Sequence, residues 1–176
     1  MEYSVKIYKS NNNDTARFVL GNVLEKPLFV IGLNPSTANE QNPDPTIRKV
    51  MGFAEGNGFD SFIMLNLYPQ RATNPDDLHL EINTEMYNQN LIEIKELLSK
   101  HKNPIFLASW SEKVKMRKYL GDCIKSIVEI TNEHNVKWKK IGELTKKRHP
   151  RHPLYSSYAL GLNDFDIEEY LNMHKI

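Results

Sequence analysis

Three polar side chains of this 176-residue sequence have the chemistry to recognise a ligand: Asn34, Asn66 and His152. An asparagine amide donates and accepts hydrogen bonds side by side, so it can hold a water molecule or read the edge of a nucleobase. The imidazole of a histidine can stabilise negative charge on a leaving group. If the fold brings the three together, they form a site that binds a nucleobase or a nucleic acid.

The first asparagine lies in a loop that directly follows an apolar stretch and reads Gly32-Leu33-Asn34-Pro35-Ser36. Gly32 lets the backbone or a ligand approach closely, because it has no Cβ. Asn34 precedes a proline, which restricts its backbone to extended geometry and holds its short side chain rigidly. We predict that this loop contacts a substrate. The alternative is an Asn-Pro turn that only directs the chain.

The second asparagine, Asn66, ends another apolar stretch. A buried amide without a hydrogen bond costs about 1–3 kcal/mol, so either its own loop or a ligand must satisfy it. Tyr68 and Arg71 follow closely, and either could stack on a base or contact a phosphate. We predict a substrate contact for all three residues, with core packing as the alternative for Tyr68.

The third stretch with candidate residues is 149–157, which contains two prolines and is therefore stiff. His149 and His152 both project from it, and either could be the functional histidine. An apolar side chain can push between base steps, and hydroxyl groups can contact phosphates. The nucleic-acid contacts predicted here are Leu154, Tyr155 and Ser156. The alternative is a basic surface loop before the last helix.

The charge distribution points to the same stretch. The net charge is only +1, but residues 137–151 contain seven Lys or Arg and a single acid, Glu143. Such a local basic surface can attract phosphates, although a solvated strand and loop would look the same. The predicted nucleic-acid contacts in this run are Lys146, Lys147, Arg148 and Arg151.

The sequence lacks the motifs that several common classes of enzyme and metal site require. The one cysteine, Cys123, excludes an internal disulfide and a cysteine zinc cluster, and we predict that it is buried packing rather than a nucleophile. The chain has no P-loop, no G-x-G-x-x-G, no G-x-S-x-G and no H-E-x-x-H. P-loop hydrolysis and dinucleotide redox chemistry are therefore disfavoured, and no cofactor and no metal are expected.

The bulk properties predict a soluble, monomeric, cytoplasmic protein of one domain, residues 1–176, that does not associate with membranes. No apolar run approaches the roughly 20 residues that cross a bilayer, and the start lacks the apolar core of a signal peptide. Alternating residues at 3–9 and 15–20, joined by an Asn-rich turn, predict an N-terminal β-hairpin within residues 1–25 that packs on the domain.

The elements that must position the candidate residues alternate between strand and helix. Apolar runs predict strands at 28–31, 62–65, 105–108 and 124–130, with 136–144 as a candidate fifth. Helix starts are predicted at Asp44, Asn83, Ser111 and Asp164. This order predicts a three-layer α/β/α fold with a central, mostly parallel four-stranded sheet.

In such sheets, ligands bind beyond the carboxyl ends of the strands. That rule selects the loops after Ile31, Leu65 and Ala108. The first two loops carry Asn34 and Asn66. In the third, Trp110 is expected to pack the following helix onto the sheet.

Taken in order, four short motifs resemble the uracil-DNA glycosylase superfamily over roughly residues 28–158. They are Gly32-Leu33-Asn34-Pro35-Ser36, Met64-Leu65-Asn66, Ala108-Ser109-Trp110 and His152-Pro153-Leu154. More closely still, the chain looks like a bacterial family described as domain of unknown function 1643, which shares its stretches 33–38, 44–46, 66–67 with 71–75, and 152–154.

The glycosylase resemblance implies an N-glycosidase that acts on a base flipped into a pocket. Asn66 would read the edge of the base, Asn34 would position the attacking water, and His152 would stabilise the departing base anion. Leu154 would fill the gap in the duplex. The phosphate contacts would come from Ser36 and Ser156.

The sequence departs from the best-known uracil enzymes, which have Asp in place of Asn34 and an aromatic residue in place of Ser36. Uracil specificity is therefore not implied, and the single cysteine excludes the iron–sulfur subfamilies. The main alternative is a module that binds nucleic acid or a nucleotide without catalysis. A third is a small-molecule hydrolase or transferase built on the same fold.

Overall fold

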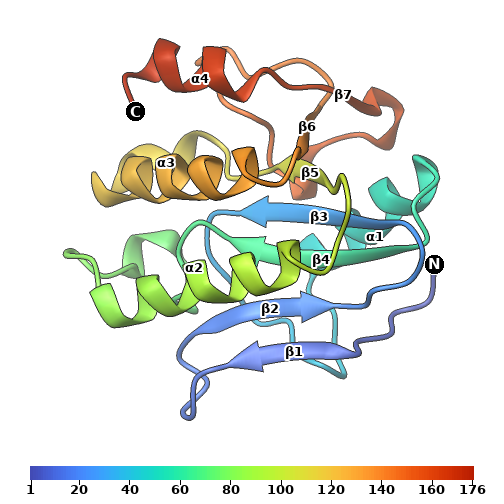
Figure 1. Cartoon of the computed structure of the whole chain (residues 1–176), viewed down its shortest axis with the longest axis horizontal. Coiled ribbons are helices and arrows are strands. Elements are labelled where there is room, and N and C mark those ends of the chain that lie inside the picture. The colour runs from blue at the N-terminus through green and yellow to red at the C-terminus, as the bar shows by residue number, and fades with distance from the viewer.

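A single mixed sheet of seven strands runs through the computed structural model, which describes residues 1–176 (Figure 1). The strand order is β1-β2-β4-β3-β5-β6-β7, and the four central strands are parallel. The flanking strands are antiparallel to their neighbours. The strands are β1 Ile7–Ser10, β2 Arg17–Gly21, β3 Pro27–Gly32, β4 Ser61–Asn66, β5 Ile105–Ala108, β6 Lys137–Ile141 and β7 Leu162–Asp164.

Helices cover both faces of the sheet, which gives three layers. The helices are α1 Pro45–Gly56, α2 Thr84–Leu98, α3 Tyr119–Asn132 and α4 Ile167–His174. Figure 1 shows α2 and α3 in front of the sheet and α1 behind it, and the buried side chains accordingly form two clusters, one on each face. None of the helices combines the length and apolar character needed to cross a bilayer.

Two helix starts were predicted correctly from their caps. The Asp44 carboxylate accepts a hydrogen bond from the backbone N–H of Ile47 at 2.9 Å, and Pro45 occupies the first helical position of α1. Asn83 caps α2 in the same way by accepting from the N–H of Met86 at 3.0 Å.

The extent of the sheet corrects the prediction of a four-stranded sheet with a separate hairpin. The hairpin β1-β2 is present, but it continues the sheet, because β2 pairs antiparallel with β4. β7 extends the opposite side by pairing with β6. Both additions cover parallel strands whose backbone groups would otherwise be left as open edges.

The segment 124–130 is helical, so the strand predicted there is wrong. Its β-branched residues suggested a strand, but Leu120, Ile124, Ile127 and Val128 are buried along one face of α3. The fourth parallel strand is β6, which lies within the candidate fifth strand at 136–144. The helix predicted after Ser111 is only a 3₁₀ turn, η2 Glu112–Met116, that precedes α3.

The last helix also starts later than predicted. Its cap is Asp166, which accepts from the N–H of Glu169 at 2.8 Å, whereas Asp164 belongs to β7. Between β6 and β7 the chain forms two short 3₁₀ turns, η3 Pro153–Tyr155 and η4 Tyr158–Leu160, which lie against α1.

The path of the chain creates a crevice at one end of the sheet. After β3, the connection through α1 leads to β4 on one side, and the connection through α2 then returns to β5 on the other side. The strand order therefore reverses between β3 and β5, and the loops that leave them diverge to opposite faces. Ligand sites of open α/β sheets lie at such points.

Candidate functional site

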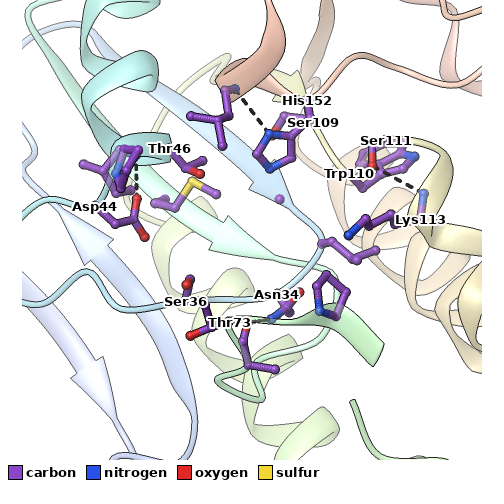
Figure 2. Close-up of a pocket in the computed structure, with 18 of the residues that line it drawn as sticks. Asn34, Ser36, Asp44, Thr46, Thr73, Ser109, Trp110, Ser111, Lys113 and His152 are labelled. Atoms are coloured by element: carbon purple, nitrogen blue, oxygen red, sulfur yellow. Dashed lines mark hydrogen bonds between the residues drawn. The ribbon is translucent and has the colours of Figure 1, made fainter. Parts of the chain in front are cut away.

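A cavity of about 370 Å³ opens beyond the carboxyl ends of β3 and β5, where the strand order reverses. Four segments that are distant in sequence supply most of its wall: 32–37, 44–47, 109–113 and 152–155. Figure 2 shows side chains from these segments around a common space. The volume falls within the range of about 300–1,000 Å³ that is typical of small-molecule sites.

Asn34 lines this cavity, and its own loop holds its side chain. Its Nδ2 donates to the backbone oxygens of Pro35 at 2.9 Å and of Ala72 at 2.8 Å. Both amide hydrogens are therefore used, while Oδ1 has no partner within the protein. The geometry leaves Asn34 as a fixed acceptor for a water molecule or for an N–H of a ligand.

His152 reaches the cavity from the side opposite Asn34 (Figure 2). Its Nδ1 accepts a hydrogen bond from the backbone N–H of Leu154 at 3.2 Å, so the hydrogen of the neutral ring is on Nε2. Burial and the nearby Lys113 hold the pKa of His152 below its ordinary value of 6.5, against the opposing effect of Asp44. At neutral pH, His152 is therefore an uncharged donor.

The other histidine of this stretch, His149, lies outside the cavity. It is fully buried, its Nδ1 is 2.9 Å from the Tyr170 hydroxyl, and its ring stacks on His174 at 4.2 Å. Tyr170 in turn accepts a hydrogen bond from Trp110 Nε1 at 3.1 Å. Of the two candidate histidines, His152 is the one that lines the site.

Asn66 lies beneath the cavity and does not line it. The side chain is fully buried next to Gly32, its partner in the β3–β4 register. In the amide orientation that satisfies its surroundings, Asn66 Nδ2 donates to the backbone oxygens of Leu65 at 3.2 Å and of Asn34 at 3.3 Å. Asn66 therefore supports the loop that carries Asn34, and the structure gives it no direct contact with a ligand.

Gly32 permits this close packing. A Cβ at this position would lie 2.5 Å from Met64 Cε and 2.9 Å from the Asn66 amide. Pro35 is buried and does not line the cavity, whereas Leu33 and Ser36 do.

Neither Tyr68 nor Arg71 lines this cavity, and the hydrogen bonds of both side chains stabilise the fold. Tyr68 is fully buried, and its hydroxyl is 2.8 Å from His79 Nδ1 and accepts from the N–H of Asn83 at 3.0 Å. The Arg71 guanidinium donates to the backbone oxygens of Ser36 and Ala38 and pairs with Asp14 at 3.2 Å. Arg71 thus braces the loop that follows β3.

The prediction that Cys123 is buried packing is confirmed, whereas Trp110 packs against the last helix, α4, and not against the helix that follows it in sequence. Trp110 is fully buried, packs against Tyr170 and forms part of the cavity wall. Cys123 is fully buried in α3, and burial raises the pKa of its thiol to about 12, so no reactive thiolate is available near neutral pH.

Two charged residues of the cavity were not predicted as site residues. Arg17, at the start of β2, is only 1% exposed, and one of its terminal nitrogens donates to the backbone oxygen of Ala38 at 3.0 Å. Burial and the nearby Arg71 lower the pKa of Arg17 to about 10, which still leaves it charged. Asp44, the cap of α1, is 9% exposed and lines the same cavity.

Arg17 was missed because it lies in a strand that alternates apolar and polar residues. With Ala16, Phe18 and Leu20 as the apolar set, the pattern assigned it to the solvent-facing side. Asp44 was expected to cap a helix, and it does so while it also faces the cavity. The structure contains no cluster of three His, Cys, Asp or Glu side chains that could hold a metal ion.

The model of the family described as "Protein of unknown function (DUF1643)" matches residues 17–154 of the chain. The chain belongs to this family. No curated protein and no solved structure matches it, so the resemblance to uracil-DNA glycosylases rests on the ordered motifs alone. The DUF1643 match begins at Arg17 and ends at Leu154, and it contains every residue that lines the cavity except Tyr155.

Two of the residues predicted to contact nucleic acid, Leu154 and Tyr155, lie at the rim of the DUF1643 cavity. Leu154 lines the cavity, and Tyr155 lines it while remaining 85% exposed. Ser156 differs, because it is buried and its hydroxyl donates to the backbone oxygen of His152 at 2.9 Å. Its predicted contact with a phosphate does not fit this arrangement.

The basic run of the DUF1643 chain is partly engaged within the protein. Arg151 donates to the backbone oxygen of Glu143 at 2.8 Å, and Lys147 pairs with Glu112 at 3.1 Å. Lys146 and Arg148 are exposed. The Lys147–Glu112 pair joins the basic loop to η2, whose Lys113 belongs to the cavity wall, so this loop adjoins the cavity.

Buried His149 should make the stability of this DUF1643 domain depend on pH. Burial, with His174 and two nearby lysines, lowers the pKa of His149 to about 4 against the opposing effect of Glu112. As the pH falls below the ordinary value of 6.5, the unfolded chain binds a proton that the folded protein does not. We expect the free energy of unfolding to fall by up to about 3 kcal/mol between pH 6.5 and 4.

Denaturant unfolding across this pH range measures the effect. Because carboxylates titrate in the same range, the comparison is with His149→Gln, which removes the imidazole and can still accept a hydrogen bond from Tyr170. The variant should lose stability less steeply than the wild type, and equal slopes would show that His149 does not carry the dependence.

Proposed function

We propose that the cavity binds a nucleobase and that the protein hydrolyses the N-glycosidic bond joining that base to its sugar. The observation that carries this proposal is the placement of Asn34 and His152. One presents a fixed acceptor, the other presents a neutral donor, and both face the same cavity from opposite sides (Figure 2).

In this reaction, the bond between the base nitrogen and C1′ of the sugar breaks, and its electron pair leaves with the base. The oxygen of a water molecule forms the new bond to C1′, and the proton that it releases passes to solvent or to the departing base. Asn34 Oδ1 would orient the water. An amide does not titrate near neutral pH, which suffices where the sugar develops oxocarbenium character and needs only a weak nucleophile. His152 Nε2–H would donate to the departing base.

The rim of the cavity supports a substrate larger than a free base. Tyr155 offers an exposed aromatic face on which a neighbouring base can stack, and exposed Lys113 offers a charge to a phosphate. The partner in this proposal is therefore a nucleic acid, preferably DNA, or a nucleotide. The active form in this proposal is a monomer.

Base excision should fall by about 10²-fold in Asn34→Ala, because misplacing the attacking water costs this much. The assay incubates the protein with oligonucleotides that hold uracil, thymine mismatches or deaminated purines, and then measures abasic sites. The control is Gln41→Ala, because Gln41 is exposed further along the same loop and does not line the cavity, so this variant should keep the wild-type rate. The glycosidase proposal fails if the wild type forms no more abasic sites than Asn34→Ala.

A non-catalytic binding module is the second candidate. It is favoured by the engagement of Asn34 Nδ2 with the backbone, because a residue fixed in this way can serve purely as a hydrogen-bond acceptor for a bound base. Retention of an oligonucleotide without abasic-site formation would select this function over the glycosidase.

A further inference from the structure

The cavity holds two buried residues of opposite charge that do not pair with each other. Arg17 is 1% exposed and Asp44 is 9% exposed, and both belong to the cavity wall. Buried ionic side chains normally form ion pairs. Here no nitrogen of Arg17 lies within 4.0 Å of a carboxylate oxygen of Asp44, and neither residue has another ion-pair partner.

Each of the two side chains also has unused hydrogen-bonding capacity. The Arg17 guanidinium has one hydrogen bond, to the backbone oxygen of Ala38, and its Nε is buried without any partner. Asp44 Oδ1 accepts from the N–H of Ile47, and Oδ2 accepts from no protein group. The second terminal nitrogen of Arg17 also has no protein partner, and neither this nitrogen nor Asp44 Oδ2 is fully enclosed by protein atoms, so a ligand in the cavity can bond to both groups.

Arg17 and Asp44 together determine which hydrogen-bonding groups the ligand must carry. A phosphate would satisfy Arg17, but the carboxylate of Asp44 would repel it. A neutral edge with an acceptor beside a donor would satisfy both residues. Such an edge occurs in bases where a ring C=O is next to a ring N–H, which is the lactam arrangement.

We propose that Arg17 and Asp44 are the residues that select the base, and that they bind a nucleobase with a lactam edge. Arg17 donates to the carbonyl oxygen, and Asp44 accepts from the adjacent N–H. This inference deepens the proposed function and rests on its base-binding part, but not on cleavage. It also replaces Asn66 as the residue that reads the base, since Asn66 does not line the cavity.

Inosine and adenosine provide a matched test, because both have a purine ring attached to ribose in the same way and their bases differ only at the edge in question. Adenosine has an amino donor where inosine has the carbonyl, and a bare ring nitrogen where inosine has N–H. In the same pose, adenosine would therefore point a donor at Arg17 and a lone pair at Asp44. A site built to hydrogen-bond a ligand rejects the mismatched analogue strongly, so we expect inosine to bind at least about 100-fold more tightly.

The experiment is titration calorimetry of the wild-type protein with inosine, adenosine and cytidine. Tighter binding of inosine supports the inference. If adenosine or cytidine binds as well as inosine, base binding stands but the lactam inference fails. If none of the three nucleosides binds at millimolar concentration, the base-binding part of the proposed function and the lactam inference both fail. The oligonucleotide assay tests cleavage separately.

Two substitutions test the residues themselves. Asn caps helices as well as Asp does, so Asp44→Asn should keep the fold while it replaces the free acceptor with a donor. Arg17→Met removes the charge and keeps a side chain of similar length. Each variant should weaken inosine binding by about 100-fold. Arg48→Met is the matched control, because Arg48 is exposed on the first turn of α1, does not line the cavity and should leave binding unchanged.

Thermal unfolding separates recognition from a structural role. Replacing an unpaired buried charge with an apolar side chain is often neutral or stabilising, so Arg17→Met without ligand should unfold at the same or a higher temperature than the wild type. A large decrease in that temperature would show that Arg17 maintains the fold, and would overturn its assignment. If Arg17→Met does not fold, unchanged inosine binding in Asp44→Asn would equally overturn the proposal.

Discussion

Replacing His152 with asparagine should lower the rate of base excision by about 10²–10³-fold, the usual effect of removing one donor from a site that stabilises developing charge. The shorter amide side chain would keep an oxygen near the position of Nδ1, which can still accept from the N–H of Leu154, so the η3 turn should survive. The variant lacks the Nε2–H donor that faces the cavity. Single-turnover kinetics on the most reactive oligonucleotide measures the effect, and an unchanged rate would show that His152 does not assist the leaving base.

The pH profile provides a second measurement on the same residue. The proposed active form is the neutral ring, and burial together with Lys113 lowers the pKa of His152. The excision rate should therefore stay level above the ordinary value of 6.5 and decrease only below the lowered pKa. Lys113→Met removes a nearby cation, so it should raise the pKa of His152 and move this decrease to higher pH. A rate that rises with acidity would instead make the imidazolium the active form.

The central strands were predictable because their sequence signals are local. Residues 28–31, 62–65 and 105–108 are short apolar runs bounded by turn residues, and each is a parallel strand of the structure. Asp44 and Asn83 were recognisable as caps because each precedes an amphipathic stretch.

The α3 segment shows where local signals fail. Its residues Ile124, Ile127 and Val128 favour strands by composition, yet they also match one helical face. The tertiary contacts with α2 and the sheet determine the outcome, and they are not visible in a short window of sequence. The position of the hairpin at the edge next to β4 is likewise a long-range pairing that turn chemistry does not specify.

Some residues of the candidate site were likewise predictable from local sequence, and others were not. Asn34 and His152 were identified because strand-end loops and stiff proline-rich loops are common ligand positions, and the structure brings both to one cavity. Asn66 was predicted at the correct strand end, but its side chain is fully buried next to Gly32 and does not line the cavity. Arg17 lies in β2, whereas Asn34 follows β3. The two residues are distant in sequence, so only the folded structure reveals that both line the same cavity.

Replacing Trp110 with alanine should lower the free energy of unfolding by about 3–5 kcal/mol, the usual cost of removing a large buried aromatic side chain. Trp110 is fully buried, and its ring lies 6.0 Å from that of Trp138 and 5.8 Å from that of Tyr170. The loss is a large share of the roughly 5–15 kcal/mol that stabilises a typical domain. Urea unfolding measures it, and a loss below about 1 kcal/mol would contradict the packing described here.

Trp110→Phe separates packing from hydrogen bonding. The variant keeps most of the buried ring but loses the N–H that donates to Tyr170, whose hydroxyl can still donate to His149. It should therefore lose only about 1 kcal/mol, the net value of one hydrogen bond. Because Trp110 both lines the cavity and packs against α4, the alanine variant should also bind inosine more weakly under conditions where it remains folded. Full inosine affinity in folded Trp110→Ala would show that this part of the wall does not shape the ligand site.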